Sequence, residues 1–233
     1  MIEVMNVEVA GFAPAIKGMR NPMNSWERSD SHECRLVPEG DDCVFCEFND
    51  TVCGCYYVGL NDRDLMRRLY KGGDEHRKYL RMLPIWMTVK APLFWWKEFD
   101  TYKVGTVRNS CSTMHKIHVA QFTYDDFSHE GIDEAGGLYK LNFERYLTTL
   151  EDLRDAFNAT QEKKYWRALI EMLPEGFMLQ ATVMFNYEVA ENIYRQRKNH
   201  KLTEWHTFCD TIMRLPYFAE ITGREKEEAE DNV

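Results

Sequence analysis

The chain has 233 residues, of which 44% are hydrophobic, 29% charged and 13% aromatic. This composition is typical of a globular protein and excludes a disordered chain, a coiled-coil rod and a collagen-like repeat. The net charge of −9 argues against polymeric DNA or RNA as a partner, because phosphate neutralisation dominates that affinity. A small anionic ligand needs only a local group of cations.

The chain carries no signal for a membrane or for secretion. No stretch approaches the roughly 20 apolar residues of a membrane span. The first residues, MIEVMNVEVAGF, lack a basic region followed by an apolar one, so no secretory signal is predicted. Seven cysteines are an odd number, which favours reduced thiols over a disulfide framework. We therefore expect a cytoplasmic protein without a membrane partner.

The N-terminal part predicts a strand followed by irregular chain. Residues 2–10 alternate apolar and polar side chains, with a break at Met5-Asn6, and predict a strand. Residues 11–31 predict a short helix with loops. Residues 32–59 hold five of the seven cysteines and predict an irregular Cys-rich excursion.

Helices and one buried strand are expected next. A helix should begin at Asp62, with Asn61 as its cap, and end at Gly72-Gly73. A second helical piece is predicted over residues 74–83. Residues 85–89 are uniformly apolar apart from Thr88 and predict a buried strand.

The second half predicts mainly helices. Pro92 fits the first turn of a helix that runs to about Lys103, where its missing N–H costs nothing. Residues 104–118 are polar and rich in turns, and residues 124–137 predict a loop. Further helices are expected over residues 139–157, 160–172, 178–198 and 202–214. The economical interpretation is one α+β domain over residues 1–223, with an acidic frayed tail at 224–233.

The Cys-rich segment raises the question of a metal. Its cysteines could supply soft ligands to zinc, with His32 upstream; they are Cys34, Cys43, Cys46, Cys53 and Cys55. Acidic neighbours crowd this segment, and a C-x-C pair is not a common structural half-site. Simple buried or surface thiols are therefore favoured over zinc, and a redox C-x-x-C lacks the expected strand and helix around it.

A cationic cluster lies at the end of a predicted amphipathic helix and comprises Arg195, Arg197, Lys198, His200 and Lys201. One interpretation is a solvated helix end, where positive charges suit the helix dipole. The other is a phosphate or carboxylate site that uses the planar fork of an arginine. The pattern by itself leaves both open.

Residues 90–118 combine aromatic, cationic and hydroxyl side chains. Trp95, Trp96 and Phe99 are typical of a core or a subunit interface. Downstream, cations and hydroxyls without nearby acids form a candidate anion pocket; they are Lys103, Arg108, Ser110, Ser112, Thr113, His115, Lys116 and His118. No nucleophile triad, dinucleotide-binding glycine motif or P-loop is present.

At this segment the chain resembles the flavin-dependent thymidylate synthases. Residues 87–94, MTVKAPLF, are similar to the approach to that family's signature, R-H-R-x-x-S-x-N-E-x-S-x-R. The first three signature positions fall on Thr101, Tyr102 and Lys103. With one inserted residue, Asn109 and Ser112 match the later N and S. The remaining S, E and final R fall on Val107, Ser110 and Met114.

Three other stretches resemble the family in the same order. Residues 7–26 correspond to its first strand and early helix, and residues 72–76, GGDEH, to a turn that lies by the flavin. Leu173-Pro174 precedes the family's last helices, where its pattern R…H-A-Q-x-E maps onto Arg197, His200 and Glu204. The resemblance covers most of the chain and omits the Cys-rich segment and the tail.

This resemblance implies an α+β fold with a small, mostly antiparallel sheet and many helices. It also implies a homotetramer that binds FAD and deoxyuridine monophosphate (dUMP) at subunit junctions. Losing each charge-assisted arginine contact costs about 1.5–3 kcal/mol, so the changed signature predicts loss of the parent methylation. We expect a diverged protein that binds a nucleotide-type anion, and sequestration of that ligand is one role open to such a binder. The expected contacts are Lys103, Arg108, Asn109, Ser110, Ser112, His115, Arg197 and His200.

Two alternatives stay open at this point. One is an active flavin-dependent thymidylate synthase that converts dUMP to thymidylate with a rewired signature. The other is a structural or interaction protein with an empty pocket, in which the tryptophan-rich helix serves only assembly.

Overall fold

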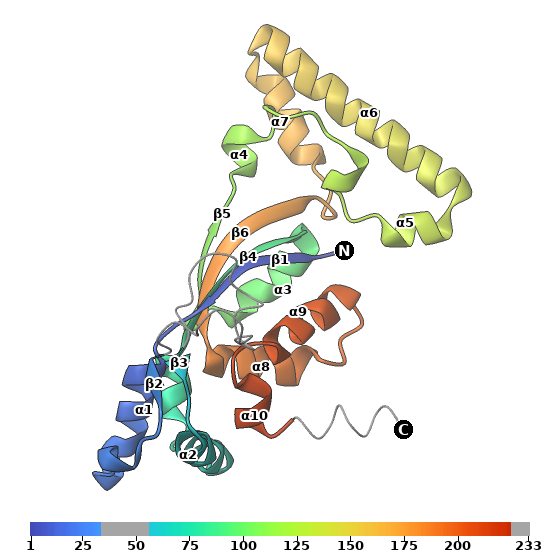
Figure 1. Ribbon diagram of the computed structural model, residues 1–233. Helices are drawn as coiled ribbons and strands as arrows, with labels where there is room; N and C mark the ends of the chain where they lie inside the picture. The colour runs from blue at the N-terminus through green and yellow to red at the C-terminus, as the bar shows by residue number, and fades with distance from the viewer. Residues whose placement is uncertain (34–55, 225–233) are drawn as a thin grey trace, which may run out of the picture. The chain divides into compact units, whose positions relative to one another are not determined.

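The structure is a computed structural model that describes residues 1–33 and 56–224. Residue contacts divide the chain into two compact units (Figure 1). Unit 1 comprises Met1–Glu3, Val89–Thr101 and Arg108–Thr182, and unit 2 comprises Val4–Thr88, Tyr102–Val107 and Val183–Val233. The expected single domain over residues 1–223 stays a prediction.

A four-stranded sheet has the order β1-β4-β6-β5. The strands are β1 (Glu3–Val9), β4 (Pro84–Pro92), β5 (Val107–Ser110) and β6 (Met178–Asn186). A separate antiparallel pair joins β2 (His32–Glu33) to β3 (Tyr56–Tyr57) on either side of the Cys-rich residues. The small sheet among many helices confirms the predicted α+β class.

The first strand and the buried strand were both predicted correctly. In β1, Asn6 has a φ of 51°, a left-handed conformation that asparagine tolerates better than most residues. This residue explains the break in the alternation at Met5-Asn6. In β4, Ile85, Met87 and Val89 are fully buried, as their uninterrupted apolar character indicated.

The helix predicted over residues 178–198 was wrong in its first half, which is strand β6. Leu179, Ala181, Val183 and Phe185 are buried, whereas residues 180 and 182 are exposed, so burial follows the period of two of a strand. Apolar residues four apart, such as 179 and 183, also satisfy a helical pattern, which explains the error. Helix α8 (Tyr187–Arg197) begins only where the Asn186 side chain accepts hydrogen bonds from two backbone N–H groups.

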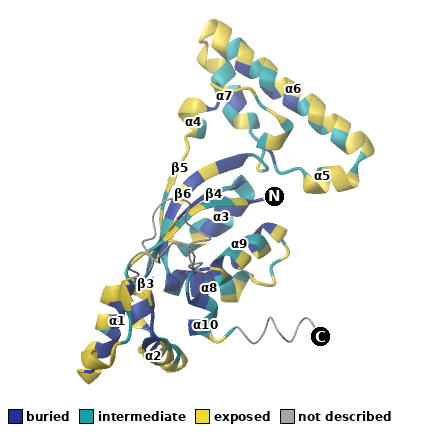
Figure 2. Ribbon diagram, in the orientation of Figure 1, coloured by how far each residue is buried: buried dark blue, intermediate teal, exposed yellow. Residues whose placement is uncertain are grey.

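Unit 1 contains a helical hairpin of α6 (Gly137–Thr160) and α7 (Lys163–Met172), as predicted. Its shorter helices are α3 (Leu93–Phe99), α4 (Thr113–Lys116) and α5 (Glu130–Ala135), the last lying where a loop was expected. The core of the helical hairpin is built on Ile117, Phe127, Leu147, Leu150 and Leu169. Figure 2 shows most of α6 as exposed or half-buried, with few buried positions.

The aromatic side chains of α3 are buried inside the chain. Trp95, Trp96 and Phe99 are almost completely buried within the chain, and the Trp95 and Phe99 rings stack at 5.2 Å between centroids. The indole N–H of Trp96 donates to the backbone oxygen of Leu179 at 2.9 Å. These side chains are therefore core residues and supply no surface for assembly.

Unit 2 contains α1 (Phe12–Arg20), α2 (Leu60–Lys71), α8, α9 (Thr203–Met213) and α10 (Phe218–Thr222). Residues 74–83 hold only a short 3₁₀ helix, Lys78–Met82. Asn61 is not the cap of α2. The Asp30 carboxylate accepts from the backbone N–H groups of Asn61 and Asp62 at 2.9 and 3.2 Å, so the cap comes from a distant segment. The helix ends at Gly72-Gly73 as predicted.

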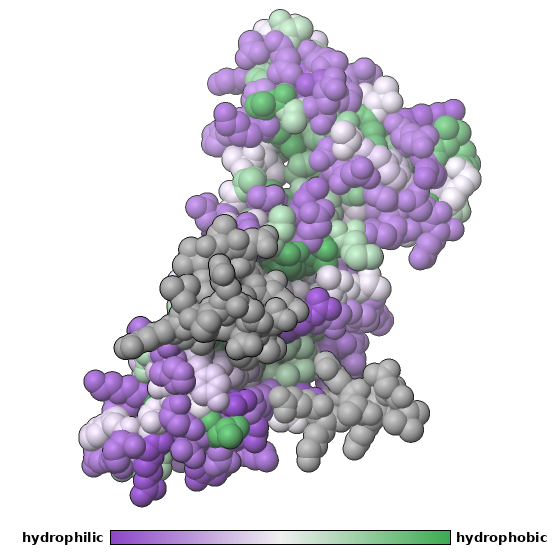
Figure 3. Space-filling view, in the orientation of Figure 1, coloured by the Kyte–Doolittle hydropathy of each residue, from purple (hydrophilic) through white to green (hydrophobic). Residues whose placement is uncertain are grey.

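The described part of the C-terminus is anchored. Arg224, assigned from sequence to the frayed tail, donates to the fully buried carboxylate of Glu191 at 2.6 and 2.8 Å. The rest of the predicted tail, residues 225–233, lies outside the described residues. Within residues 1–33 and 56–224, no helix is both long and apolar enough to cross a bilayer. Figure 3 shows a largely hydrophilic surface over α6 and α7.

Candidate functional site

Arg197, at the end of α8, lies within a group of aromatic side chains in unit 2. Its Nε–H donates to the Tyr102 hydroxyl at 2.9 Å, and Tyr102 donates onward to the Gln196 side chain at 3.0 Å. The guanidinium carbon lies 4.8 Å from the centre of the Trp205 ring and 5.7 Å from that of Tyr102. Cation–π contact and the hydrogen bond together fix the plane of the guanidinium.

Three side chains from separate segments form what we call the Arg197 cluster: Tyr102, Arg197 and Trp205. Tyr102 occupies the second position of the R-H-R stretch in the resemblance, and Arg197 occupies its later arginine position. The structure thus brings together two stretches that the resemblance assigned to one ligand site. Trp205 was missed from the sequence, although it lies directly after Glu204 of the matched pattern.

His200 borders the Arg197 cluster in the loop between α8 and α9. Its ring lies 6.2 Å from the Trp205 ring, centre to centre. Its Nδ1 accepts the backbone N–H of Leu202 at 3.2 Å, which places the proton of the neutral ring on Nε2. The His206 ring contacts the backbone oxygen of His200 at 2.7 Å. These contacts fix the loop and the orientation of the His200 ring.

Lys103 is exposed in the turn that follows Tyr102. The turn closes with a hydrogen bond from the Thr106 N–H to the Lys103 oxygen, at 3.3 Å. Gly105 has a φ of 82°, and a Cβ there would approach Val189 of α8 to 3.2 Å. A glycine is therefore required for this turn to pack on α8, which places Lys103 in the same unit as the Arg197 cluster.

Arg108, in unit 1, is already used inside the fold. It forms an ion pair with Asp100 at 3.1 Å, and its guanidinium lies 5.0 Å from the Trp96 ring centre. The sequence interpretation counted it among cations without nearby acids. That was wrong because Asp100, eight residues earlier at the end of α3, folds back beside it.

The other predicted contacts of unit 1 are exposed polar groups. Asn109 and Ser110 are exposed at the end of β5, and His115 is exposed on α4. The Ser112 hydroxyl accepts from the His115 N–H at 3.0 Å and so caps α4. These four residues and Arg108 belong to unit 1, whereas Lys103, Arg197 and His200 belong to unit 2. The predicted set therefore forms two local groups.

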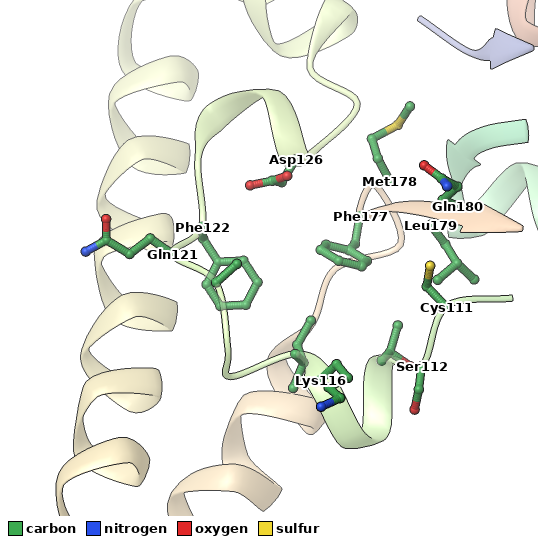
Figure 4. A pocket seen from close by; sticks show the side chains of 13 residues that line it. Cys111, Ser112, Lys116, Gln121, Phe122, Asp126, Phe177, Met178, Leu179 and Gln180 are labelled. Carbon is green, nitrogen blue, oxygen red and sulfur yellow. The ribbon is translucent and has the colours of Figure 1, made fainter. Parts of the chain in front are cut away.

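Unit 1 also contains a pocket of about 230 Å³, whose apolar walls the sequence did not reveal (Figure 4). It is lined by Cys111, Ser112, Thr113, Lys116, Ile117, Ala120, Gln121, Phe122, Asp126, Phe177, Met178, Leu179 and Gln180. Three residues of the candidate anion pocket line it, namely Ser112, Thr113 and Lys116, and Ser112 is also one of the expected ligand contacts. The backbone N–H of Cys111 donates to the Gln180 oxygen at 2.9 Å, which holds one wall against β6.

The zinc hypothesis concerns Cys34, Cys43, Cys46, Cys53 and Cys55, which lie outside the described residues. In the described part of the chain, no group of three or more His, Cys, Asp or Glu side chains is arranged to hold a metal ion. The two cysteines found there, Cys111 and Cys209, are free thiols.

No protein-family model and no curated protein sequence matches the chain. Solved structures do match. A crystal structure of thymidylate synthase X from Helicobacter pylori with FAD and dUMP is 15% identical and has a TM-score of 0.63, covering 95% of this chain and 97% of the other. The fold is that of a flavin-dependent thymidylate synthase. A second H. pylori structure with the same ligands gives the same identity and TM-score, with 94% and 97% coverage.

The thymidylate synthase fold confirms the resemblance that the sequence suggested. Coverage near the full length of both chains means that the match extends over both units. At 15% identity the comparison establishes the fold, and the chemistry must be argued from this chain's own residues.

Proposed function

We propose that this chain binds a nucleotide-type anionic ligand on a flavin-dependent thymidylate synthase fold, and that it does not catalyse the parent methylation. The observation that carries this proposal is the Arg197 cluster. Its guanidinium is oriented by Tyr102 and Trp205 before any ligand arrives, so little side-chain entropy is lost on binding. A planar, pre-oriented guanidinium is suited to phosphate or carboxylate oxygens.

Three positions argue against the parent reaction. The resemblance assigns arginine to positions 101, 103 and 114. Thr101 instead donates its hydroxyl to the backbone oxygen of Glu98 at 2.7 Å, and Met114 is an apolar side chain with 48% of its surface exposed. Lys103 alone keeps a positive charge, without the two-pronged geometry of arginine. These residues do not fit the anchoring of FAD that the resemblance implies.

The binding test uses the whole chain, dUMP and FAD. We expect dUMP to raise the melting temperature of the wild-type protein, since a ligand that binds only the folded state stabilises it. Arg197→Ala should weaken dUMP binding by about 2–4 kcal/mol while the protein stays folded. Arg197→Lys should be intermediate because it keeps the charge but loses the fork. Lys198→Ala, on the next exposed residue, is the matched control and should bind normally.

Other outcomes would support the alternatives. Equal and small effects of Arg197→Ala and Lys198→Ala would show that Arg197 is a helix-end charge. A purified protein with flavin absorbance and dUMP-dependent flavin turnover would favour an active synthase. Stabilisation by neither dUMP nor FAD would favour a structural or interaction protein.

We further propose that the protein is cytoplasmic and that it assembles as a homotetramer, with the nucleotide pocket at a subunit junction. Both proposals rest on the resemblance to the flavin-dependent thymidylate synthases. The exposed residues Asn109, Ser110, Ser112 and His115 stay predicted contacts of the ligand.

A further inference from the structure

The pocket of unit 1 has mainly apolar walls, and its volume limits the size of a ligand. Ile117, Met178 and Leu179 are buried, and the half-buried rings of Phe122 and Phe177 meet edge to face at 6.3 Å. An apolar protein cavity of about 150 Å³ holds a benzene molecule. A volume of about 230 Å³ therefore admits one six-membered ring with a small substituent. Drug-sized ligands need larger pockets, roughly 300–1,000 Å³.

The charges around the pocket are unbalanced. Lys116 lines it and forms no ion pair with any residue in the described ranges. Asp126 also lines it, but its carboxylate already accepts the N–H and the hydroxyl of Thr123, both at 2.8 Å. Figure 4 shows Asp126 and Lys116 on opposite sides of the phenylalanine rings. The Lys116 ammonium is thus the charged group of the lining that is available to pair with a ligand.

Uncharged polar groups complete the lining. The side-chain amides of Gln121 and Gln180 form no hydrogen bond within residues 1–33 and 56–224. Each amide can both donate and accept. A polar substituent on a bound ring could therefore form hydrogen bonds with these amides, and no hydrogen bond within the described fold would have to break.

We propose that this pocket binds a single aromatic ring that carries a carboxylate. The ring lies against Phe122, Phe177 and Ile117, where aromatic edges and faces interact favourably. The carboxylate pairs with the Lys116 ammonium at the mouth. The pocket shares no residue with the Arg197 cluster, so this inference does not depend on the proposed nucleotide site.

Benzoate is the probe, with benzamide as its uncharged isostere. We expect benzoate to bind the full chain, by NMR titration, about 5-fold more tightly than benzamide, which is the scale of an exposed ion pair. Lys116→Gln should lower benzoate affinity to that of benzamide and leave benzamide unchanged. Lys163→Gln removes an exposed lysine of the same unit that does not line the pocket and should change neither. Equal effects of the two variants on benzoate would overturn the proposal.

A second measurement places the probe in the pocket. Cys111 is exposed at the rim, and its alkylation by N-ethylmaleimide can be followed by peptide mass spectrometry separately from every other cysteine. Benzoate should slow labelling of Cys111 in the wild type. Ala120→Phe, which fills the pocket from an exposed loop position, should abolish both benzoate binding and this protection. Benzoate binding without protection of Cys111, or unaffected by Ala120→Phe, would contradict the assignment.

The Arg197→Ala variant separates this inference from the proposed function. Benzoate binding should be unchanged in it, whereas dUMP binding should fall. Loss of benzoate binding in Arg197→Ala would show that the aromatic ring binds at the Arg197 cluster and would overturn the pocket assignment.

Discussion

At the scale of single residues, Asp62 shows how a buried charge is tolerated. Its side chain is fully buried, and it pairs with Arg20 at 2.6 Å. The hydroxyls of Ser29 and Ser31 donate to the same carboxylate at 2.7 and 2.6 Å. Burial by itself would raise the pKa of Asp62, but the hydrogen bonds from Ser31, Ser29 and Arg20 outweigh it, and the pKa lies below its ordinary value of 3.8.

Removing one partner of this pair should be costly. We expect Arg20→Met to lower the free energy of unfolding by about 3–5 kcal/mol, because it leaves a buried carboxylate without its counter-ion. The matched control is Arg68→Met, which breaks an exposed pair with Asp64 at 3.0 Å and should cost about 0–1 kcal/mol. Similar losses in the two variants, measured by urea unfolding, would contradict the buried-pair account.

The same carboxylate predicts a dependence on pH. Because its pKa is lower in the folded state than in the unfolded state, Asp62 stabilises the fold above its unfolded pKa and loses this contribution as the pH falls through the folded pKa. Asp62→Asn should therefore flatten the acid limb of the stability curve. If the acid limb of Asp62→Asn is unchanged, another group causes the loss of stability at low pH.

Two cysteines of the described chain should differ in reactivity. Burial raises the pKa of the Cys209 thiol to about 12, so almost no reactive thiolate is present at pH 8. Cys111 is exposed. We expect N-ethylmaleimide to label Cys111 in the native protein and Cys209 only after unfolding. Rapid native labelling of Cys209 would indicate that α9 opens.

At the scale of elements, α10 and Arg224, two residues beyond it, are joined to the rest of unit 2 by ion pairs. The Glu220 carboxylate of α10 forms ion pairs with Arg63 of α2, at 2.8 Å, and with Arg67. Arg224 reaches Glu191 of α8, whose carboxylate also accepts the Tyr70 hydroxyl at 2.6 Å. The guanidinium of Arg224 lies 4.6 Å from the Tyr194 ring centre. Ion pairs thus hold α10 at Glu220 and the chain just beyond it at Arg224.

Arg224 is the contact whose loss should matter most here. Arg224→Met should destabilise unit 2 by about 3–5 kcal/mol, since Glu191 would remain buried and charged without a counter-ion. Arg214→Met changes an exposed arginine between α9 and α10 and should alter the melting temperature little. Glu191→Gln with Arg224→Met should recover part of the loss, because the uncompensated charge is then gone. Full stability of Arg224→Met alone would contradict the anchored C-terminus.

At the scale of the whole molecule, assembly is the first prediction. The thymidylate synthase fold and the resemblance lead us to expect a tetramer with closed symmetry. Light scattering at micromolar concentration should give four times the chain mass of 27.6 kDa. A mass near that of one chain would remove the subunit junction at which we place the nucleotide pocket.

Activity in a cell is the second prediction at this scale. We expect no growth of a thymidine-requiring strain that expresses this chain, because Thr101 and Met114 stand where the reaction's arginine anchors are expected. The thymidylate synthase X of H. pylori is the positive control in the same vector. Growth that depends on this chain alone would establish the active-synthase alternative.

The class of fold and several elements could be predicted from local sequence patterns. Strand β4 and helices α6, α7 and α9 follow from local apolar periodicity, which each segment carries whatever its partners are. The break in β1 at Asn6 was visible as a break in alternation. The resemblance rested on the order of short matches along the chain, and the match to solved structures confirms it.

Strand β6 and the pairing of charged side chains depend on contacts between distant segments. The segment of β6 satisfies a helical and an extended pattern equally, and its place between β4 and β5 in the sheet selects the strand. Arg108 is neutralised by Asp100, and Asp30 caps α2 across 31 positions. The hydrogen bond between Arg197 and Tyr102 spans 95 positions. Local periodicity records which face of an element is buried, but it contains no information on which distant side chain will meet that face.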